Sequence, residues 1–346
     1  MKTKPAGAHS MARKSPVKLD EVAREAGVSP ATVSRILNGT AAVSALKTLA
    51  VESAIRKLGF TPNPVARGLA GGRTMSIGVI TQAIDSPFYG AALRGIEDRL
   101  DPIGYCPLFV SGHWDAAAES RGVELLLARR VDGIIVLTGR LTDQALRACA
   151  RRVPVVVTGR DMKAPGLYSL NFDNFEGGRL ATQHLLDLGH REIAFVAGDG
   201  QHPDANERLR GHMHALKSAG VAANAALIVP GAYNELSGSL AVDKLLTSGI
   251  RFTAIFAAND QMALGAMLGL QRRAVRVPDD VSVVGYDDLP NAPYSNPPLS
   301  TIHQPAYELG ELAAASMLQL VNGERPQGTL PAPRFVARES ARRVGR

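Results

Sequence analysis

The spacing of apolar positions near the start of the chain predicts three short helices. Apolar residues in 19–26 fall on one helical face, and Gly27 then ends the helix because glycine tolerates a left-handed backbone. A second amphipathic segment follows at 30–37. A third begins after Ser44, which we expect to cap it, and ends at Gly59. Two short helices joined by a tight glycine-containing turn are typical of a helix-turn-helix.

The second of these helices is suited to the major groove of DNA. Ser29 is a good N-cap, and Pro30 fits the first helical turn. The side chains expected to pack inward are those of Val33, Ile36 and Leu37. The outward side chains are small or can form hydrogen bonds: Pro30, Ala31, Thr32, Ser34 and Arg35. Small residues permit close approach to base pairs and donors can reach base edges, although an ordinary helical hairpin would show the same spacing.

Residues 61–72 predict a short helix that needs a partner. Asn63 can cap it, Pro64 occupies its first turn, and Gly71-Gly72 provides a flexible exit. A helix of about seven residues is unstable alone in water, so it would form only when docked. Leu69 would be exposed on it, either as a wedge between base steps in the minor groove or as a linker residue packed against the body.

From Ser76 onward, apolar strand-like runs alternate with amphipathic helical stretches. The expected strands are 76–80, 105–110, 133–137, 153–157, 192–196, 254–256 and 281–286. The expected helices are 89–100, 116–129, 175–188, 209–219, 237–247 and 262–271. Continuous apolar strands between amphipathic helices are typical of parallel sheets covered on both faces. The number of these units predicts two α/β lobes with a ligand-binding cleft between them.

Charge separates the head from the body. The chain of 346 residues has a net charge of +7, and residues 1–75 hold 12 Lys and Arg against 4 Asp and Glu. A basic head on a nearly neutral body is typical of polyanion binding, but a basic disordered tail would have the same charge. Cys106 and Cys149 lack metal-ligand spacing, and the sequence shows no secretion signal and no stretch of 18 apolar residues. We therefore expect a cytoplasmic, nucleoid-associated protein with no metal or other cofactor.

Polar and aromatic residues near the predicted strand ends are candidates for ligand binding. They are Phe88, Tyr89, Arg160, Arg208, Tyr233, Asn259 and Asp287. Carboxylates and amides suit hydroxyl groups, an aromatic ring suits the face of a sugar or base, and Arg suits an anion. Asn259 could instead cap the following helix, and Arg160 could pair with Asp161. No Gly-x-Ser-x-Gly elbow, phosphate loop or zinc motif is present, so we do not expect an enzyme.

Several runs together resemble the LacI/GalR family of bacterial repressors. Residues 21–39, Glu-Val-Ala-Arg-Glu-Ala-Gly-Val-Ser-Pro-Ala-Thr-Val-Ser-Arg-Ile-Leu-Asn-Gly, carry the family's head signature. The matches in the body are Gly-His-Arg-Glu-Ile (189–193), Asn-Asp-Gln-Met-Ala-Leu-Gly-Ala-Met (259–267), Gly-Tyr-Asp-Asp (285–288) and Thr-Ile-His-Gln-Pro (301–305). Residues 45–50, Ala-Leu-Lys-Thr-Leu-Ala, depart from the family, where a Thr-Arg pair with further charges is usual.

The resemblance implies an α + α/β fold class, with a helix-turn-helix head, a hinge helix and a two-lobed α/β sensor domain like that of periplasmic binding proteins. The expected divisions are a flexible tail at 1–16, a DNA-binding domain at 17–61, a hinge at 62–73 and an effector-binding and dimerisation domain at 74–346. Within that domain, lobe 1 is expected at about 74–159 and 289–319, and lobe 2 at about 160–288 and 320–340.

The resemblance also implies a transcription regulator, with repression as the expected mode, that binds a pseudopalindromic DNA operator as a homodimer. The residues that it implies for DNA contact are Leu19, Ser29, Pro30, Ala31, Thr32, Ser34, Arg35, Asn38, Asn63, Ala66, Arg67 and Leu69. The effector would be a sugar, sugar acid or related metabolite. Many sugar-binding relatives have Asp where Gly159 stands here, and Arg160 follows it, which favours an anionic sugar derivative. A secreted sugar-binding protein, an enzyme and a body that only dimerises remain the alternatives.

Overall fold

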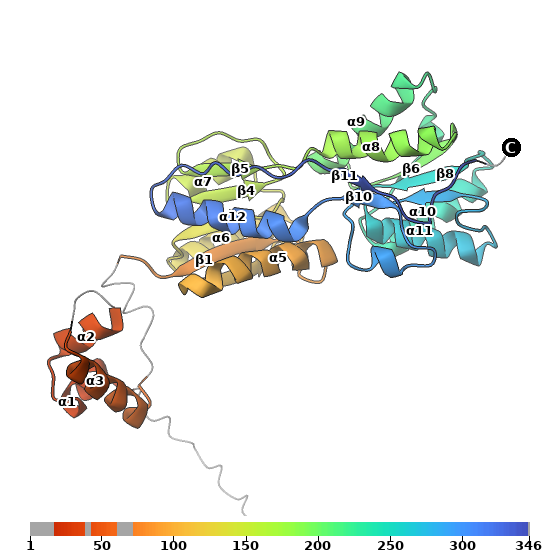
Figure 1. The fold of residues 1–346 in the computed structure, drawn as a ribbon. Helices are drawn as coiled ribbons and strands as arrows, with labels where there is room; N and C mark the ends of the chain where they lie inside the picture. Colours follow the sequence, from red (N-terminus) through yellow and green to blue (C-terminus); the bar gives the residue numbers. More distant parts are fainter. Residues whose placement is uncertain (1–16, 39–42, 61–71, 345–346) are drawn as a thin grey trace, which may run out of the picture. The chain divides into compact units, whose positions relative to one another are not determined.

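The computed structural model describes residues 17–38, 43–60 and 72–344, and the chain divides into two compact units, Met1–Met75 and Ser76–Arg346. We call the described part of the first unit the head and the second unit the body. The secondary structure of each unit is drawn in Figure 1. The helical head and the alternating α/β body that the hydrophobic pattern predicts are both present.

The head is a three-helix unit around a small apolar core. Its helices are α1 (Leu19–Glu25), α2 (Pro30–Asn38) and α3 (Ala45–Leu58). Gly27 and Gly59 both have φ of 63°, so they follow α1 and α3 in the left-handed conformation expected of them. The fully or almost fully buried side chains are those of Val22, Ala23, Val33, Val51 and Ala54. Ile36 and Leu37 are partly buried against this core, as predicted for the inner face of α2.

The caps of the head helices confirm one prediction and correct another. The backbone N–H of Thr32 donates to Ser29 Oγ over 3.2 Å, so Ser29 caps α2 as predicted. Ser44 occupies the N-cap position of α3, but its side chain makes no capping hydrogen bond. Leu46 and Leu49, in the first two turns of α3, are 82% and 60% exposed. The apolar face of this helix is therefore buried only from Val51 onward.

The first lobe of the body is built on a five-stranded parallel sheet. The strands are β1 (Ser76–Thr81), β2 (Cys106–Ser111), β3 (Gly133–Val136), β4 (Val155–Thr158) and β5 (Leu167–Leu170), in the order β2-β1-β3-β4-β5. The helices are α5 (Pro87–Leu100), α6 (Ala116–Ala128), α7 (Asp143–Ala150) and α12 (Ala306–Val321). Two separate apolar clusters include residues of these strands, in agreement with a sheet covered on both faces.

The second lobe is built on a four-stranded parallel sheet. Its strands are β6 (Ile193–Ala197), β7 (Ile228–Pro230), β8 (Ala254–Ala257) and β9 (Ser282–Val284), in the order β7-β6-β8-β9. Its helices are α8 (Asn174–Asp187), α9 (Pro203–Ser218), α10 (Glu235–Thr247) and α11 (Asp260–Arg272). An antiparallel pair, β10 (Thr301–His303) with β11 (Arg334–Val336), completes the body, and short 3-10 turns lie at Asp101–Ile103, Ala225–Leu227 and Ala292–Tyr294.

The lobe boundaries expected from the sequence are wrong in two places. β5 pairs with β4, so the first lobe continues to residue 170 rather than ending at 159. Ala292, Leu299 and Ile302 belong to the core of the second lobe, so the segment before α12 does not return to the first lobe at 289. The chain crosses between the lobes after β5, before α12 and after α12. Strand pairing and shared core decide these boundaries, and neither is visible in local apolar spacing.

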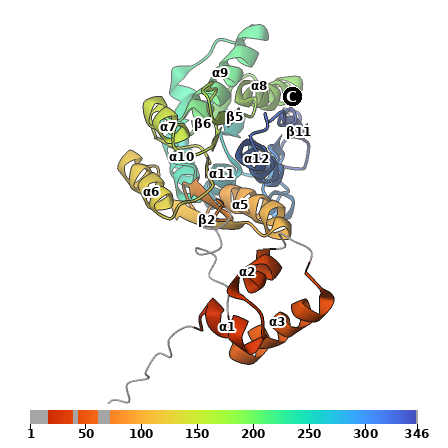
Figure 2. The same cartoon turned by 90° about the vertical axis from the view of Figure 1, so that its left-hand side faces the viewer.

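Close helix pairs cover the sheets, and each pair meets at glycines. The pair α5 and α12 brings together helices more than 200 positions apart in the sequence, and they lie side by side in Figures 1 and 2. A Cβ added at Gly310 would lie 1.9 Å from the carbonyl oxygen of Ala92, and one added at Gly95 would lie 2.1 Å from that of Tyr307. Equivalent glycines bring α8 against α9 (Gly178, Gly211) and α10 against α11 (Gly238, Gly265). Only the missing side chains allow these backbones to approach so closely.

We predict that Gly310→Ala destabilises the body by about 1–3 kcal/mol, because the added methyl group meets the backbone of α5 and the helices must separate. The measurement is urea unfolding followed by far-ultraviolet circular dichroism. Gly90→Ala, in α5, is the matched control, because its Cβ would meet nothing within 4 Å. The control should leave stability unchanged or raise it by up to about 1 kcal/mol. Equal midpoints for the two variants would contradict the close-approach argument.

Candidate functional site

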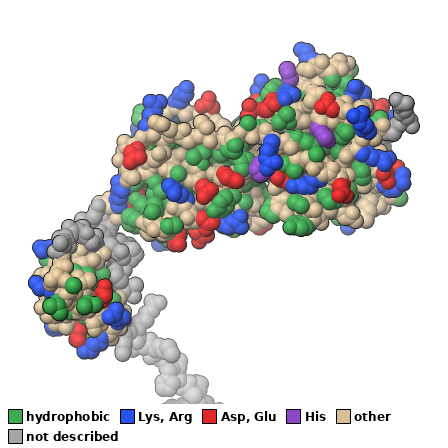
Figure 3. All heavy atoms as spheres, viewed as in Figure 1, with side chains coloured by type: hydrophobic (Ala, Val, Ile, Leu, Met, Phe, Trp, Pro, Cys, Tyr) green, Lys and Arg blue, Asp and Glu red, His purple; other side chains and the backbone are tan. Residues whose placement is uncertain are grey.

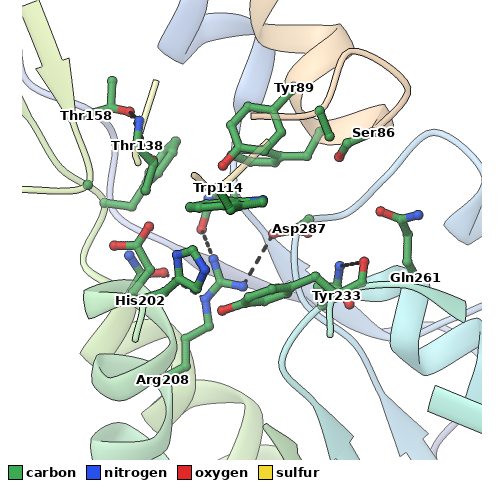
Figure 4. A pocket seen from close by; sticks show the side chains of 18 of the residues that line it. Ser86, Tyr89, Trp114, Thr138, Thr158, His202, Arg208, Tyr233, Gln261 and Asp287 are labelled. Carbon is green, nitrogen blue, oxygen red and sulfur yellow. Dashed lines mark hydrogen bonds and ion pairs between the residues drawn. The ribbon is translucent and has the colours of Figure 1, made fainter. Parts of the chain in front are cut away.

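A cavity of about 330 Å³ lies between the two lobes of the body (Figure 4). Its wall includes residues at or just after the carboxyl ends of strands in both sheets. Thr138 follows β3 and Thr158 ends β4 in the first lobe, while Asn259 follows β8 and Asp287 follows β9 in the second. The carboxyl ends of parallel strands are where open α/β sheets bind ligands, so this cavity is the candidate effector site.

Six of the seven predicted ligand-binding residues line this cavity: Phe88, Tyr89, Arg208, Tyr233, Asn259 and Asp287. Arg160 does not. Its guanidinium donates to the carbonyl oxygen of Gly139 and lies 3.4 Å from Asp143 Oδ1, in an adjoining groove between the lobes that shares Gly159, Phe172, Asn174 and Asp204 with the cavity. Arg160 is therefore next to the cavity but not part of its wall, and its contact with an anionic effector stays a prediction.

Arg208, from α9, is the most constrained side chain in the cavity wall. Its Nε donates to Asn174 Oδ1 over 2.9 Å, its Nη1 donates to the carbonyl oxygen of Ala258, and its Nη2 donates to Gln304 Oε1 over 3.2 Å. The guanidinium carbon lies 3.7 Å from the ring centroid of Tyr286, where a cation–π contact stabilises the charge. Gly178 permits this placement, since a Cβ there would lie 2.2 Å from the carbonyl oxygen of Arg208.

Two carboxylates of the second lobe share the cavity with Arg208, and Asp85 of the first lobe also lines it. Asp287 Oδ1 lies 3.7 Å from Arg208 Nη1, and burial raises the pKa of Asp287 to about 7 even though Arg208 opposes this shift. Burial also raises the pKa of Asp204, which stands in the first turn of α9, one turn before Arg208. Asp287 has a φ of 112°, a backbone conformation that a residue other than glycine rarely adopts. Such strain is concentrated where a side chain has to be held in a particular direction.

Aromatic rings form a continuous wall from one lobe to the other. Tyr89 contacts Trp114 edge-on with ring centroids 6.1 Å apart, and Trp114 contacts His202 at 3.8 Å. His202 in turn lies 5.9 Å from Tyr233. Tyr89 and Trp114 belong to the first lobe, whereas His202 and Tyr233 belong to the second, so this wall crosses the cleft (Figure 4). Burial lowers the pKa of His202 and so favours the uncharged form of its ring.

A charged pair also crosses the cleft beside the cavity. Arg140 Nη2, in the loop after β3, lies 2.6 Å from Asp199 Oδ2, in the loop after β6. The loop that carries Arg140 is fixed by Glu119, a fully buried carboxylate that accepts the backbone N–H groups of Arg140 and Leu141 over 2.8–2.9 Å. The relative position of the two lobes is thus tied to particular polar contacts as well as to the covalent crossings.

Sequence reasoning did not identify Trp114 and Asp204 as cavity residues, although signals for both were present. Trp114 is the chain's only tryptophan and follows a predicted strand at 105–110. Asp204 precedes Arg208 by four residues, and that spacing places two side chains on the same face of a helix. Asn174 and Gln304 had no such signal, because they reach the cavity from segments far away in sequence.

The predicted DNA-contact residues of the head are not all described by the structure. Ser29, Pro30, Ala31 and Arg35 are exposed. Thr32 and Ser34 are half-buried, and Leu19 is partly buried against the head core. Asn38 is the last residue of α2. The other four, Asn63, Ala66, Arg67 and Leu69, lie outside the described residues.

The surface of the body carries side chains of both charges. Basic and acidic side chains are interspersed over the face that Figure 3 shows. Among residues 17–38, 43–60 and 72–344, no helix is long and apolar enough to cross a membrane. The same part of the chain contains no group of three or more His, Cys, Asp or Glu side chains that could hold a metal ion.

Comparison with known proteins gives two family matches and full-length relatives. The family of bacterial regulatory proteins named after lacI matches residues 18–63, and a periplasmic binding protein-like domain matches residues 182–341. The HTH-type transcriptional repressor PurR of Yersinia pestis (strain Pestoides F) is 34% identical over 327 residues, which cover 93% of this chain and 96% of PurR.

Solved structures agree with these matches. The lac repressor dimer bound to operator and the anti-inducer ONPF is 34% identical, with a TM-score of 0.84 over 95% of this chain and 100% of that one. The complex of the transcriptional regulator CelR with cellobiose is 32% identical, with a TM-score of 0.70 over 94% of this chain and 100% of that one. The chain therefore belongs to the LacI family of bacterial regulatory proteins, and it is a DNA-binding transcription regulator with a small-molecule effector domain.

Proposed function

We propose that the effector is a ring-shaped, polyhydroxylated small molecule of the sugar class, and that it binds in the cavity between the lobes. The observation that supports this most directly is the wall itself, in which aromatic rings stand beside carboxylate, amide and hydroxyl groups. Aromatic faces pack against the C–H faces of sugar rings, and the polar groups suit their hydroxyl groups. CelR, which is similar along its whole length, is known in complex with cellobiose.

The residues proposed to contact the effector are Phe88, Tyr89, Arg208, Tyr233, Asn259 and Asp287, together with Trp114 and Asp204. Because these residues come from both lobes, a ligand that contacts them all binds the closed arrangement of the lobes more tightly than an open one. A body that serves only for dimerisation would not need an aromatic-lined cavity with buried charged groups.

On the DNA side, we propose that α2 enters the major groove and that the protein acts as a homodimeric repressor. The exposed Ser29, Pro30, Ala31 and Arg35 are small or carry donors, as close approach to base pairs requires. One head reads one half-site, so two-fold symmetry in the protein requires a pseudopalindromic operator. Leu236, Leu240 and Tyr294 in the second lobe are 70%, 57% and 88% exposed, and such apolar side chains are available for contact with a second copy.

For the head, we predict that Arg35→Ala weakens binding to an operator selected from random duplexes by about 1–3 kcal/mol, because a donor that faces the groove is lost. Fluorescence anisotropy with the full-length protein measures this loss. Arg56→Ala removes the same charge from an exposed position in the last turn of α3, and it should weaken binding less. Equal losses for the two variants would mean that only the net charge of the head matters.

For the body, we predict that effector binding changes the intrinsic tryptophan fluorescence of the protein, because Trp114 is the only tryptophan and lines the cavity. The measurement is a titration of the full-length protein with cellobiose and with monosaccharides. A ligand that changes the emission should also raise the Tm, by an amount that corresponds to about 2.7 kcal/mol at 100 times its Kd.

The control for this titration is Trp114→Phe, which keeps an aromatic ring but removes the fluorescent signal. A ligand bound in the cavity should still raise the Tm of this variant. A ligand that raises the Tm without changing the emission of the parent protein would bind elsewhere, and the cavity would not be the effector site.

A further inference from the structure

The charges of the residues that line the cavity restrict the chemical class of the effector more than the shape of the cavity does. This inference rests on the proposed sugar-class effector. Asp204 and Asp287 line the cavity from the second lobe and Asp85 from the first, and Arg208 is the only Arg or Lys among the described lining residues. A carboxylate that is removed from water without a partner is costly, so a ligand that brings a positive charge to these groups would be favoured.

Asp204 has no directly bonded partner within the described part of the protein, although the nearby guanidinium groups of Arg208 and Arg160 favour its charged form. Its carboxylate forms no hydrogen bond or ion pair with any of the residues that the structure describes. Its Oδ2 atom lies 3.3 Å from the point where a Cβ at Gly159 would stand, so this carboxylate reaches across to the first lobe. The absence of a side chain at Gly159 leaves room for it. Asp204 therefore lies where a ligand between the lobes would meet it.

Arg208 does not neutralise both carboxylates. Three of its N–H groups donate to uncharged acceptors, which are Asn174 Oδ1, the carbonyl oxygen of Ala258 and Gln304 Oε1. Its nearest distance to Asp287, 3.7 Å, is longer than a hydrogen bond. The cavity wall thus holds three carboxylates, Asp85, Asp204 and Asp287, against a single guanidinium whose donors are largely used.

The other cationic side chains near the cleft have partners of their own. Arg140 pairs with Asp199 at 2.6 Å, and Arg160 donates to the carbonyl oxygen of Gly139 and lies 3.4 Å from Asp143. His202 is 3.5 Å from Asp199 and packs against Trp114. None of these groups forms a direct ion pair with Asp204, so a cation carried by a ligand would be the first to do so.

The aromatic rings beside Asp204 and Asp287 also favour a cationic ligand. Tyr89, Trp114 and Tyr233 line the cavity, and the faces of aromatic rings attract cations. A neutral polyol would place its hydroxyl donors on the carboxylates but leave their charge in place. A protonated amine neutralises that charge and donates up to three hydrogen bonds.

We propose that the effector carries a protonated nitrogen, as an amino sugar does, and that Asp204 and Asp287 bind this nitrogen while the aromatic wall packs against the ring. Asp204 then acts as the residue that distinguishes an amine-bearing ring from its hydroxyl counterpart. The cavity volume of about 330 Å³ lies at the lower end of the range for small-molecule sites, which suits a ligand of one or two rings.

The test uses matched pairs of probes that differ only in the replacement of one or two hydroxyl groups by amines. The pairs are glucose and glucosamine, galactose and galactosamine, mannose and mannosamine, and cellobiose and its diamino counterpart, fully deacetylated chitobiose. Isothermal titration calorimetry of the full-length protein gives the Kd for each. We expect at least one amine to bind tenfold or more tightly than its hydroxyl partner.

The matched variants are Asp204→Asn and Glu207→Gln, which remove the same charge from the same helix. Glu207 pairs with Arg210 and does not line the cavity, so Glu207→Gln should keep the preference for the amine. Asp204→Asn should abolish that preference and, because it removes a half-buried carboxylate that has no direct partner, should raise the Tm of the ligand-free protein. A purely structural role for Asp204 would lower the Tm and leave the ratio of the two Kd values unchanged.

The outcomes separate this inference from the proposed function. If each hydroxyl sugar binds as tightly as its amine counterpart or more tightly, the proposal of a protonated nitrogen is overturned, while the proposal of a sugar-class effector stands. If an amine is preferred equally in Asp204→Asn and in the parent protein, the assignment to Asp204 is overturned. If no member of any pair binds, both the inference and the proposed sugar-class effector fail.

Discussion

The buried guanidinium of Arg208 is the interaction on which the arrangement of the ligand site depends. A cation that is almost fully removed from water must have its donors satisfied, and here the acceptors come from Asn174 in α8, Ala258 after β8 and Gln304 after β10. These three segments are distant in the sequence, and one of them leads directly into a crossing between the lobes. Satisfying this one side chain therefore brings the second sheet, its covering helices and the crossing segment to a common point.

The same requirement explains why the helices around the site approach so closely. Arg208 can reach its acceptors only if α9 lies directly against α8, and Gly178 and Gly211 remove the side chains that would keep the two helices apart. The two other close pairs use glycine in the same way. Tight backbone contact makes each lobe a rigid unit, so that movement between the lobes is concentrated at the three crossings and the contacts across the cleft.

Contacts across the cleft connect the ligand site to the rest of the body. The aromatic wall and the pair between Arg140 and Asp199 both join the first lobe to the second, and both lie beside the cavity. Glu119 holds the loop of Arg140 from within the first lobe, so these contacts have a fixed geometry. A ligand that strengthens one arrangement of the lobes has to act through its unequal contacts in the two arrangements. The residues in this cleft are therefore the ones that decide how the effector controls the protein.

Local patterns in the sequence were sufficient to predict the helices and strands whose signals lie within a short segment. Apolar spacing predicted the three head helices and seven of the strands, and glycines at 27 and 59 marked two helix ends, because helix and strand periodicity and left-handed caps are properties of short segments. Strands β5, β7, β10 and β11 and helices α7 and α12 were not predicted. The missed strands have three or four residues each, as do β3, β4 and β9, which were predicted. They are only partly buried, so they lack the continuous apolar run that marks a fully buried strand.

The tertiary structure alone decided the lobe boundaries and the composition of the ligand site. Six of the predicted ligand residues do meet in one cavity, since the ends of parallel strands gather at one edge of a sheet. The direction of a side chain is set by its neighbours in space, however, and this is why Arg160 turns to Gly139 and Asp143 instead of the cavity. It is also why Asp204 and Trp114, which come from opposite lobes, both line the cavity. The sequence suggested a basic site for an anionic ligand, whereas the cavity wall holds more carboxylates than basic side chains.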